Sequence, residues 1–270
     1  PMGAVVEHQR AGLAWREAGT GDAVVFLHGL GGTSTAWTEQ FDALASNHRC
    51  VAWDMPGYGA SDPPDPRRAM TFESVADRLV DLLDLLAVER ADLVGLSLGG
   101  MHALHTALRH PDRVRRLVLT NTSPRFGLNG TTPDEWTASR LAVLDDGTTL
   151  RELAPAVLDG LVASPLPPAR RDGLIESFAR IPESGFRDAV ACLPSHDVLD
   201  RLGEIRSPTL VIAGELDTET PPSYSRALAD GIPGARLEVL AGVGHLAPSE
   251  DPDMFNRLVG DFLDRTTITP

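Results

Sequence analysis

Residues 95–100 read Gly-Leu-Ser-Leu-Gly-Gly and lie between an apolar run typical of a strand and a run with helical character. A serine on a sharp strand-to-helix turn has its hydroxyl exposed at the end of the sheet, and small residues two positions away on either side let the backbone turn that tightly. In a glycine-rich chain the pattern alone has moderate specificity. Ser97 is therefore a candidate nucleophile whose assignment depends on the partners that the rest of the chain supplies.

Short apolar runs rich in β-forming residues alternate with longer amphipathic stretches on both sides of this turn. That alternation is typical of an α/β fold with a mostly parallel sheet. Helical spacing of apolar residues predicts helices over 72–86 and 254–263. The runs that predict strands, the first two as a hairpin, are 5–9, 13–17, 23–27, 50–53, 92–96, 117–120, 209–213 and 237–240.

Residues 123–206 break the alternation, because they contain several prolines and no strong strand signal. A structureless loop of that length is improbable in a compact domain. We therefore expect a helical cap over 123–206, inserted into a core formed by 2–122 and 207–270. Such an insertion can cover the sheet edge where ligands bind in open α/β folds. Its amphipathic, helix-like pieces are 132–144, 150–161, 168–180 and 185–193.

Charge and cysteine content restrict the possible partners. The 270 residues include 24 Lys plus Arg against 38 Asp plus Glu, a formal net charge of −14. This balance argues against nucleic-acid and anionic membrane partners, which need clustered basic side chains. Cys50 and Cys192 form no CxxC pattern, so neither a zinc site nor a disulfide framework is predicted. With a polar N-terminal stretch and no long apolar run, a cytoplasmic protein with a small-molecule partner is expected, and its oligomeric state stays open.

A serine nucleophile needs a base, and the base needs a carboxylate to orient it. Carboxylates follow the strand 209–213, where Glu215, Asp217 and Glu219 compete for this role. His245 follows the next strand, 237–240, between flexible glycine-rich positions. The carboxyl ends of parallel strands share one edge of the sheet, so both groups are expected beside Ser97.

Acyl transfer through a serine also needs donors for the oxyanion of its tetrahedral intermediate. The backbone N–H of Leu98, at the positive end of the following helix, is one candidate. The second is expected from the glycine-rich loop 28–32, with the N–H of Leu30 as the candidate. His28 follows directly after a strand, and we interpret it as a brace for this loop.

Together these residues resemble the α/β-hydrolase superfamily over nearly the whole chain. The resemblance implies an eight-stranded, mostly parallel sheet flanked by helices and a helical cap after the sixth strand. It also implies a triad of Ser97, Asp217 and His245 that works without a metal or cofactor, and it assigns Asp54 to loop ordering. The motifs that carry it, in the family's order, are His28-Gly29, 54–62, the turn at Ser97, 110–114, Gly214-x-x-Asp217 and Gly244-His245.

Within that superfamily the chain is most similar to 3-oxoadipate enol-lactonases. Residues 95–101 and 119–123 are similar to stretches of those enzymes, and Trp136-x-x-x-Arg140 resembles the start of their cap. The resemblance implies that Trp136 and Arg140 line the substrate cavity, with the guanidinium suited to a carboxylate on the lactone. The competing interpretation makes Trp136 part of the cap core and Arg140 a solvated charge. The second half of the cap departs from the lactonase pattern.

The resulting hypothesis is a cofactor-independent serine hydrolase of a small carboxylic ester or lactone. Related dehalogenases and most epoxide hydrolases use an aspartate nucleophile, so Ser97 argues against them. Carbon–carbon bond hydrolases of meta-cleavage products share the triad and cap and remain the alternative, followed by general carboxylesterases. A non-enzymatic ligand receptor on this fold is less favoured, because the full Ser, Asp and His set is present.

Overall fold

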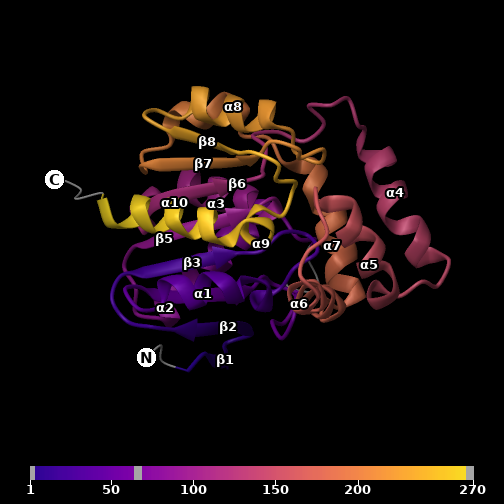
Figure 1. Ribbon diagram of the computed structural model, residues 1–270, viewed down its shortest axis with the longest axis horizontal. Coiled ribbons are helices and arrows are strands. Elements are labelled where there is room, and N and C mark those ends of the chain that lie inside the picture. Colours follow the sequence, from indigo (N-terminus) through magenta and orange to yellow (C-terminus); the bar gives the residue numbers. More distant parts are fainter. Residues whose placement is uncertain (1–3, 64–68, 266–270) are drawn as a thin grey trace.

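The computed structural model describes residues 4–63 and 69–265, and an eight-stranded sheet forms its centre (Figure 1). The strands are β1 (Val6–Arg10), β2 (Leu13–Ala18), β3 (Ala23–Leu27), β4 (Arg49–Asp54), β5 (Ala91–Leu96), β6 (Val114–Thr120), β7 (Thr209–Gly214) and β8 (Arg236–Leu240). Their order in the sheet is β1-β2-β4-β3-β5-β6-β7-β8. β2 pairs antiparallel with β1 and β4, and the other neighbouring strands are parallel. The mostly parallel sheet predicted from the sequence is confirmed.

Helices cover both faces of the sheet, because alternate residues of its strands point to opposite sides. Val25 and Leu27 of β3 belong to one buried cluster, and Val24 and Phe26 belong to the other. The first cluster contains residues of α2 (Phe72–Leu85), α3 (Leu98–Arg109) and α8 (Pro222–Gly231). The second contains residues of α1 (Thr38–Leu44), α9 (Ala247–Glu250) and α10 (Pro252–Arg265).

The segment between β6 and β7 is helical and lies at one end of the sheet, away from both termini (Figure 1). Its elements are α4 (Pro133–Asp145), α5 (Leu150–Leu161), α6 (Pro168–Ala179), α7 (Glu183–Cys192), η3 (Leu193–Ser195) and η4 (Leu199–Glu204). Leu144, Phe178 and Phe186 of these helices are buried in the same cluster as α2 and α3. The backbone N–H of Thr33, after β3, also donates to the Ser177 hydroxyl of α6 at 3.0 Å. The inserted helices therefore share a core with the sheet.

Most of the elements expected from the sequence are present within two or three residues of their expected ends. The two expected surface helices correspond to α2 and α10, and the four amphipathic pieces of the insertion correspond to α4 through α7. The helices α1, α8 and α9 and the short turns η1 (Ser34–Trp37) and η2 (Pro111–Arg113) were not expected. Residues 2 and 3, 64–68 and 266–270 of the predicted core lie outside the described residues.

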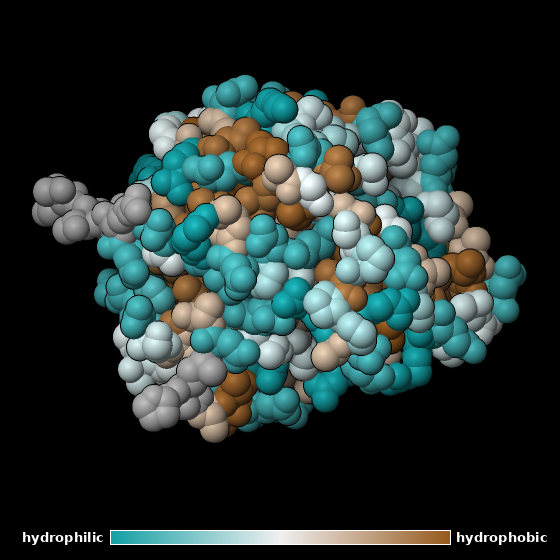
Figure 2. Space-filling view, viewed as in Figure 1, coloured by the Kyte–Doolittle hydropathy of each residue, from teal (hydrophilic) through white to brown (hydrophobic). Residues whose placement is uncertain are grey.

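The surface seen in Figure 2 is largely hydrophilic, with apolar side chains gathered over β8. Within the described ranges, no helix has the length and hydrophobicity needed to cross a bilayer. Cys50 and Cys192 are both buried free thiols. Burial raises the pKa of Cys50 to about 12 and that of Cys192 to about 11. Both side chains therefore stay protonated and unreactive near neutral pH.

Candidate active site

Ser97 occupies the turn between β5 and α3, where the backbone is strained. Its φ of 53° and ψ of −118° lie outside the regions that residues with a side chain normally adopt. The turn is also very tight. A Cβ at Gly95 would collide with the backbone of Gly99, and a Cβ at Gly99 would collide with the Leu27 carbonyl oxygen of β3. The lack of a side chain at these two positions lets the chain present Ser97 at the end of the sheet.

Asp217 and His245 lie together at the same end of the sheet, on the loops after β7 and β8. Nδ1 of His245 is 3.0 Å from Oδ1 and 2.9 Å from Oδ2 of Asp217. This contact places the imidazole proton on Nδ1 and leaves Nε2 as the basic nitrogen. The competing carboxylates are engaged elsewhere, since Glu215 accepts a backbone N–H at 2.9 Å and Glu219 pairs with Arg140.

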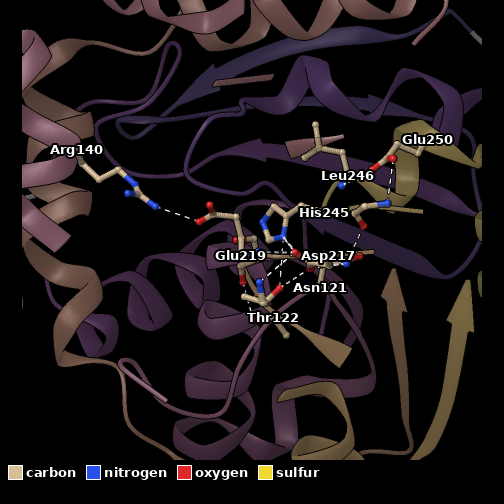
Figure 3. Close-up of polar contacts among 11 residues, drawn as sticks. Asn121, Thr122, Arg140, Asp217, Glu219, His245, Leu246 and Glu250 are labelled. Atoms are coloured by element: carbon tan, nitrogen blue, oxygen red, sulfur yellow. Dashed lines mark hydrogen bonds and ion pairs between the residues drawn. The ribbon is translucent and has the colours of Figure 1, made fainter. Parts of the chain in front are cut away.

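The buried carboxylate of Asp217 is held by hydrogen bonds to both of its oxygens (Figure 3). Oδ1 accepts the backbone N–H groups of Glu219 at 2.9 Å and Thr220 at 3.0 Å. Oδ2 accepts the Thr220 hydroxyl and the Asn121 amide, each at 2.7 Å. Burial alone would raise the pKa of Asp217, but His245, Asn121 and Thr220 hold that pKa below its ordinary value. An ionised Asp217 can therefore orient the imidazole.

A second carboxylate, Glu250, fixes the loop that carries His245 (Figure 3). Its two oxygens accept the backbone N–H groups of the residues flanking His245, at 3.0 and 2.9 Å. It also accepts the backbone N–H of Ala163, just after α5, at 2.8 Å. The backbone N–H of His245 itself donates to the Leu161 carbonyl at 2.8 Å. The position of the histidine thus depends on the inserted helices as well as on β8.

The two backbone N–H groups expected to stabilise an oxyanion belong to the loop after β3 and to the start of α3. Leu98 is the first residue of α3, so its N–H has no partner within the helix and lies at the positive end of the helix dipole. The N–H of Leu30 shares a peptide with the Gly29 carbonyl, and that oxygen accepts hydrogen bonds from the His28 ring at 2.9 Å and the Gly32 N–H at 3.2 Å. Because the N–H and C=O of a trans peptide point in opposite directions, these bonds turn the Leu30 N–H outward.

His28 has the bracing role that the sequence indicated. The backbone N–H of Met55 donates to its Nε2 at 3.1 Å, so the ring proton lies on Nδ1 and is donated to Gly29. Burial lowers the pKa of His28, although the Gly29 bond and Asp54 oppose that shift. A Cβ built on Gly29 would lie 3.4 Å from Cβ of Ser97. The braced loop therefore lies directly against the serine.

A cavity of about 760 Å³ lies between this end of the sheet and the inserted helices, and Ser97, His245 and Leu30 all line it. Ser97 and His245 both line this cavity, but among the described residues no hydrogen bond joins the Ser97 hydroxyl to the imidazole, whose side-chain bonds are all made by Nδ1. Nucleophile-to-base contacts often tighten only when a substrate is bound. The walls from the inserted helices are mainly apolar and include Leu153, Val157, Leu161, Leu174, Phe178 and Phe186.

Trp136 and Arg140 both line this cavity. The Trp136 indole donates to the Val190 carbonyl at 3.1 Å, and the Arg140 guanidinium carbon lies 4.2 Å from the Trp136 ring centroid. Nη2 of Arg140 is 3.0 Å from Oε2 of Glu219 (Figure 3). The guanidinium expected to meet a substrate carboxylate therefore already has a carboxylate partner. That partner is one of the acids that competed in the sequence for the place of Asp217.

Sequence reasoning missed Asn121, Thr220 and Glu250, which position the acid and the histidine. Asn121 reaches Asp217 across 96 positions, whereas Thr220 and Glu250 act on residues three to six positions away, without a motif that marks their role. A polar residue immediately after β6, at the shared sheet edge, was the one signal that could have indicated Asn121. In the part of the chain that the structure describes, no three His, Cys, Asp or Glu side chains are grouped as metal ligands would be.

The fold and this site define the class of protein, a hydrolase that carries its polar groups on loops at the carboxyl ends of parallel strands. The family model described as alpha/beta hydrolase fold matches residues 22–161. The chain belongs to the α/β-hydrolase family, and the resemblance seen in the sequence is confirmed.

The similar proteins include hydrolases of more than one substrate class. The 2-hydroxymuconate semialdehyde hydrolase of a Pseudomonas species is 35% identical over 256 residues, covering 92% of this chain and 88% of that protein. 3-Oxoadipate enol-lactonase 1 of Acinetobacter baylyi is 29% identical over 245 residues, covering 89% and 88%. The crystal structure of the enol-lactonase from Burkholderia xenovorans has a TM-score of 0.81 at 28% identity, covering 97% of this chain and 99% of that one. The chain is thus similar to lactone hydrolases and to a semialdehyde hydrolase.

Proposed function

We propose that this protein hydrolyses a small carboxylic ester or lactone, with Ser97 as nucleophile, His245 as general base and Asp217 as the group that orients the base. The observation that most supports this is the contact of Asp217 with His245 at 2.9 Å, on a cavity that Ser97 also lines. In this proposal residues 123–206 are the cap, and residues 2–122 with 207–270 are the catalytic core. The substrate is a small molecule held between them.

The proposed reaction has two half-reactions. Nε2 of His245 takes the proton of Ser97 as its oxygen attacks the carbonyl carbon, and the N–H groups of Leu30 and Leu98 stabilise the resulting oxyanion. The carbon–oxygen bond to the leaving group then breaks, and His245 returns the proton to that oxygen. In the second half-reaction His245 removes a proton from water, the hydroxide attacks the acyl-enzyme, and Ser97 leaves with the proton.

The enol-lactone of 3-oxoadipate is the specific substrate that the sequence resemblance suggests. The similarity to enol-lactonases in sequence and in structure supports this choice. In that molecule one carboxyl group is closed in the lactone and the other remains free, so its recognition calls for a cation in the cavity. The sequence suggests Arg140 as the cation that would bind this free carboxylate. In the structure Arg140 is paired with Glu219, which would compete with the substrate carboxylate.

Carbon–carbon bond hydrolysis is the second candidate. The 35% identity to a 2-hydroxymuconate semialdehyde hydrolase favours it. The same Ser97, His245 and Asp217 would serve, with a carbon–carbon bond to the acyl group in place of the ester bond.

Three substrates separate these possibilities. We expect turnover of a neutral 4-nitrophenyl ester or of a lactone, and we expect the variant Ser97→Ala to abolish it. Loss of the enol-lactone ultraviolet absorbance tests the specific resemblance. Turnover of a ring-fission dienone, with no turnover of esters or lactones, would replace the ester proposal by carbon–carbon hydrolysis.

A further inference from the structure

The charged side chains that line the cavity already have partners. Among the lining residues that the structure describes, the arginines are Arg125 and Arg140. Nε of Arg125 is 2.8 Å from Oδ2 of Asp197, and Nη2 of Arg140 is 3.0 Å from Oε2 of Glu219. Glu135, another lining residue, accepts both the backbone N–H and the hydroxyl of Thr132 at 2.9 Å. Both arginines of the described lining are thus already paired with a carboxylate when a substrate anion arrives.

Glu219 links the catalytic loop to the inserted helices. Its backbone N–H donates to Asp217 at 2.9 Å, while its side chain turns away from the triad toward Arg140 on α4 (Figure 3). Arg140 is held from three directions. Glu219 pairs with one edge of the guanidinium, the Ser139 hydroxyl accepts from Nη1 at 3.1 Å, and the Trp136 ring lies against its face. The cation is therefore neutralised at the cavity wall before any substrate arrives.

We propose that Glu219 determines specificity by neutralising Arg140, so that the cavity takes uncharged esters or lactones with an apolar acyl chain and rejects those with a free carboxylate. This inference rests on the proposed function and narrows its substrate class, and it argues against the enol-lactone of 3-oxoadipate, which keeps a free carboxylate. A substrate carboxylate would have to separate Arg140 from Glu219 and then lie beside the displaced Glu219. An uncharged chain meets the apolar walls formed by the inserted helices without breaking the pair.

The size of the effect follows from the exposure of the pair. The side chains of Arg140 and Glu219 are 33% and 40% exposed, so water weakens their interaction. A hydrogen bond to a charged group in such a setting accounts for a preference of about tenfold in kcat/KM. Removing the charge of Glu219 should therefore release Arg140 for a substrate carboxylate and change the preference by a similar factor.

The test compares two activated 4-nitrophenyl esters of adipate, one with its second carboxyl group neutral as the methyl ester and one with that carboxylate free. We expect the protein to prefer the neutral ester by about tenfold or more in kcat/KM. In Glu219→Gln the neutral-to-anionic ratio should fall about tenfold, through a lower KM for the anionic ester. Adding Arg140→Gln to that variant should cancel the gain.

Glu176→Gln is the matched control. Glu176 on α6 pairs with Arg151 on α5 at 2.5 Å, so this variant also takes a carboxylate partner away from an arginine. Neither residue lines the cavity. The ratio should stay within about twofold in this variant. Equal turnover of the two esters by the unchanged protein, or an unchanged ratio in Glu219→Gln, would overturn the inference and leave the proposed function standing.

Binding measurements make the test independent of turnover. Calorimetry on the Ser97→Ala variant should show weaker binding of adipate than of dimethyl adipate, and Glu219→Gln in that background should reverse much of the difference. Equal affinity for the two ligands would contradict the inference. Absence of turnover of both esters by the unchanged protein would instead count against the proposed function.

Discussion

At the scale of single residues, two positions at the site, Ser97 and Asn121, are among the four described non-glycine residues with a positive φ. Ser97 has φ of 53° and Asn121 has φ of 45°. Such a conformation costs about 1 kcal/mol or more and persists only when its surroundings impose it. The Ser97 N–H donates to the Thr120 carbonyl and the Asn121 N–H to the Ile212 carbonyl, both at 2.9 Å. Backbone hydrogen bonds to the neighbouring strands therefore fix both Ser97 and Asn121, the residue that donates to Asp217.

Asn121 is a positioning residue in this account, and Asn121→Gly removes its side chain without adding strain at a positive φ. We expect kcat for a neutral ester to fall about tenfold to a hundredfold, because one of the bonds that orient Asp217 is lost. KM should change much less. Asn256→Ala is the control. Asn256 accepts a hydrogen bond from the Gln40 side chain, and neither residue lines the cavity, so kcat should not change. A loss of folding stability without a loss of kcat would contradict the positioning role.

The triad candidates could be predicted because their spacing follows the strands. Asp217 lies three residues after the end of β7 and His245 five residues after the end of β8, and parallel strands bring such residues to one edge of the sheet. The contacts that complete the site could not be predicted in this way. Asn121 meets Asp217 across 96 positions, and Arg140 meets Glu219 across 79. The first pair depends on the pairing of β6 with β7 and the second on how α4 packs against the loop after β7, and local patterns specify neither.

At the scale of elements, the close approach of α3 to β3 controls how Ser97 is presented. Gly99→Ala would drive a methyl group into the Leu27 carbonyl oxygen. We expect the free energy of unfolding to fall by about 2 kcal/mol or more, as for other overpacked sites. Gly173→Ala on α6 is the matched control, because a Cβ there meets nothing within 4 Å. It should stabilise the protein by up to about 1 kcal/mol. Chemical denaturation of both variants tests this, and similar stabilities would contradict it.

Most strands and longer helices were predictable because they carry a full apolar run or a hydrophobic pattern over several turns, although α4 buries only Leu144. Helices α1 and α8 were missed for opposite reasons. α1 spans only 7 residues, too few for a helical period to repeat. α8 spans 10 residues and buries only Ser225 and Leu228, so few large apolar side chains mark it in the sequence. Packing against β7 and β8 stabilises it instead.

At the scale of the whole molecule, the half-buried His105 and the buried His196 join the helix behind Ser97 to the inserted segment. Nε2 of His105 lies 3.1 Å from Nδ1 of His196, and Nε2 of His196 donates to the Ser123 carbonyl at 2.8 Å. Burial lowers the pKa of His105 to about 4 and that of His196 to about 3. Burial also lowers the pKa of His102 well below its ordinary value. The folded protein therefore excludes protons that these rings would bind when unfolded.

This difference predicts that the folded state loses stability in mild acid. The unfolded histidines bind protons below about pH 6.5 and the folded ones do not, so the free energy of unfolding should fall as the pH drops from about 6.5 toward about 4. Each histidine contributes at most about 1.4 kcal/mol per pH unit. His102→Leu should reduce the slope by about one such contribution. Urea denaturation at several pH values tests this, and equal stability at pH 7 and pH 5 would contradict it.

The central claim is that Ser97 is an activated nucleophile in this cavity, and covalent labelling measures that most directly. A fluorophosphonate probe requires the serine, the base and the oxyanion donors to act together. We predict that the probe labels the folded protein at Ser97, as identified by peptide mass spectrometry. Labelling should be lost in Ser97→Ala and fall at least about a hundredfold in rate in His245→Gln. A folded protein that leaves Ser97 unlabelled, or that is labelled equally fast without His245, would contradict the account.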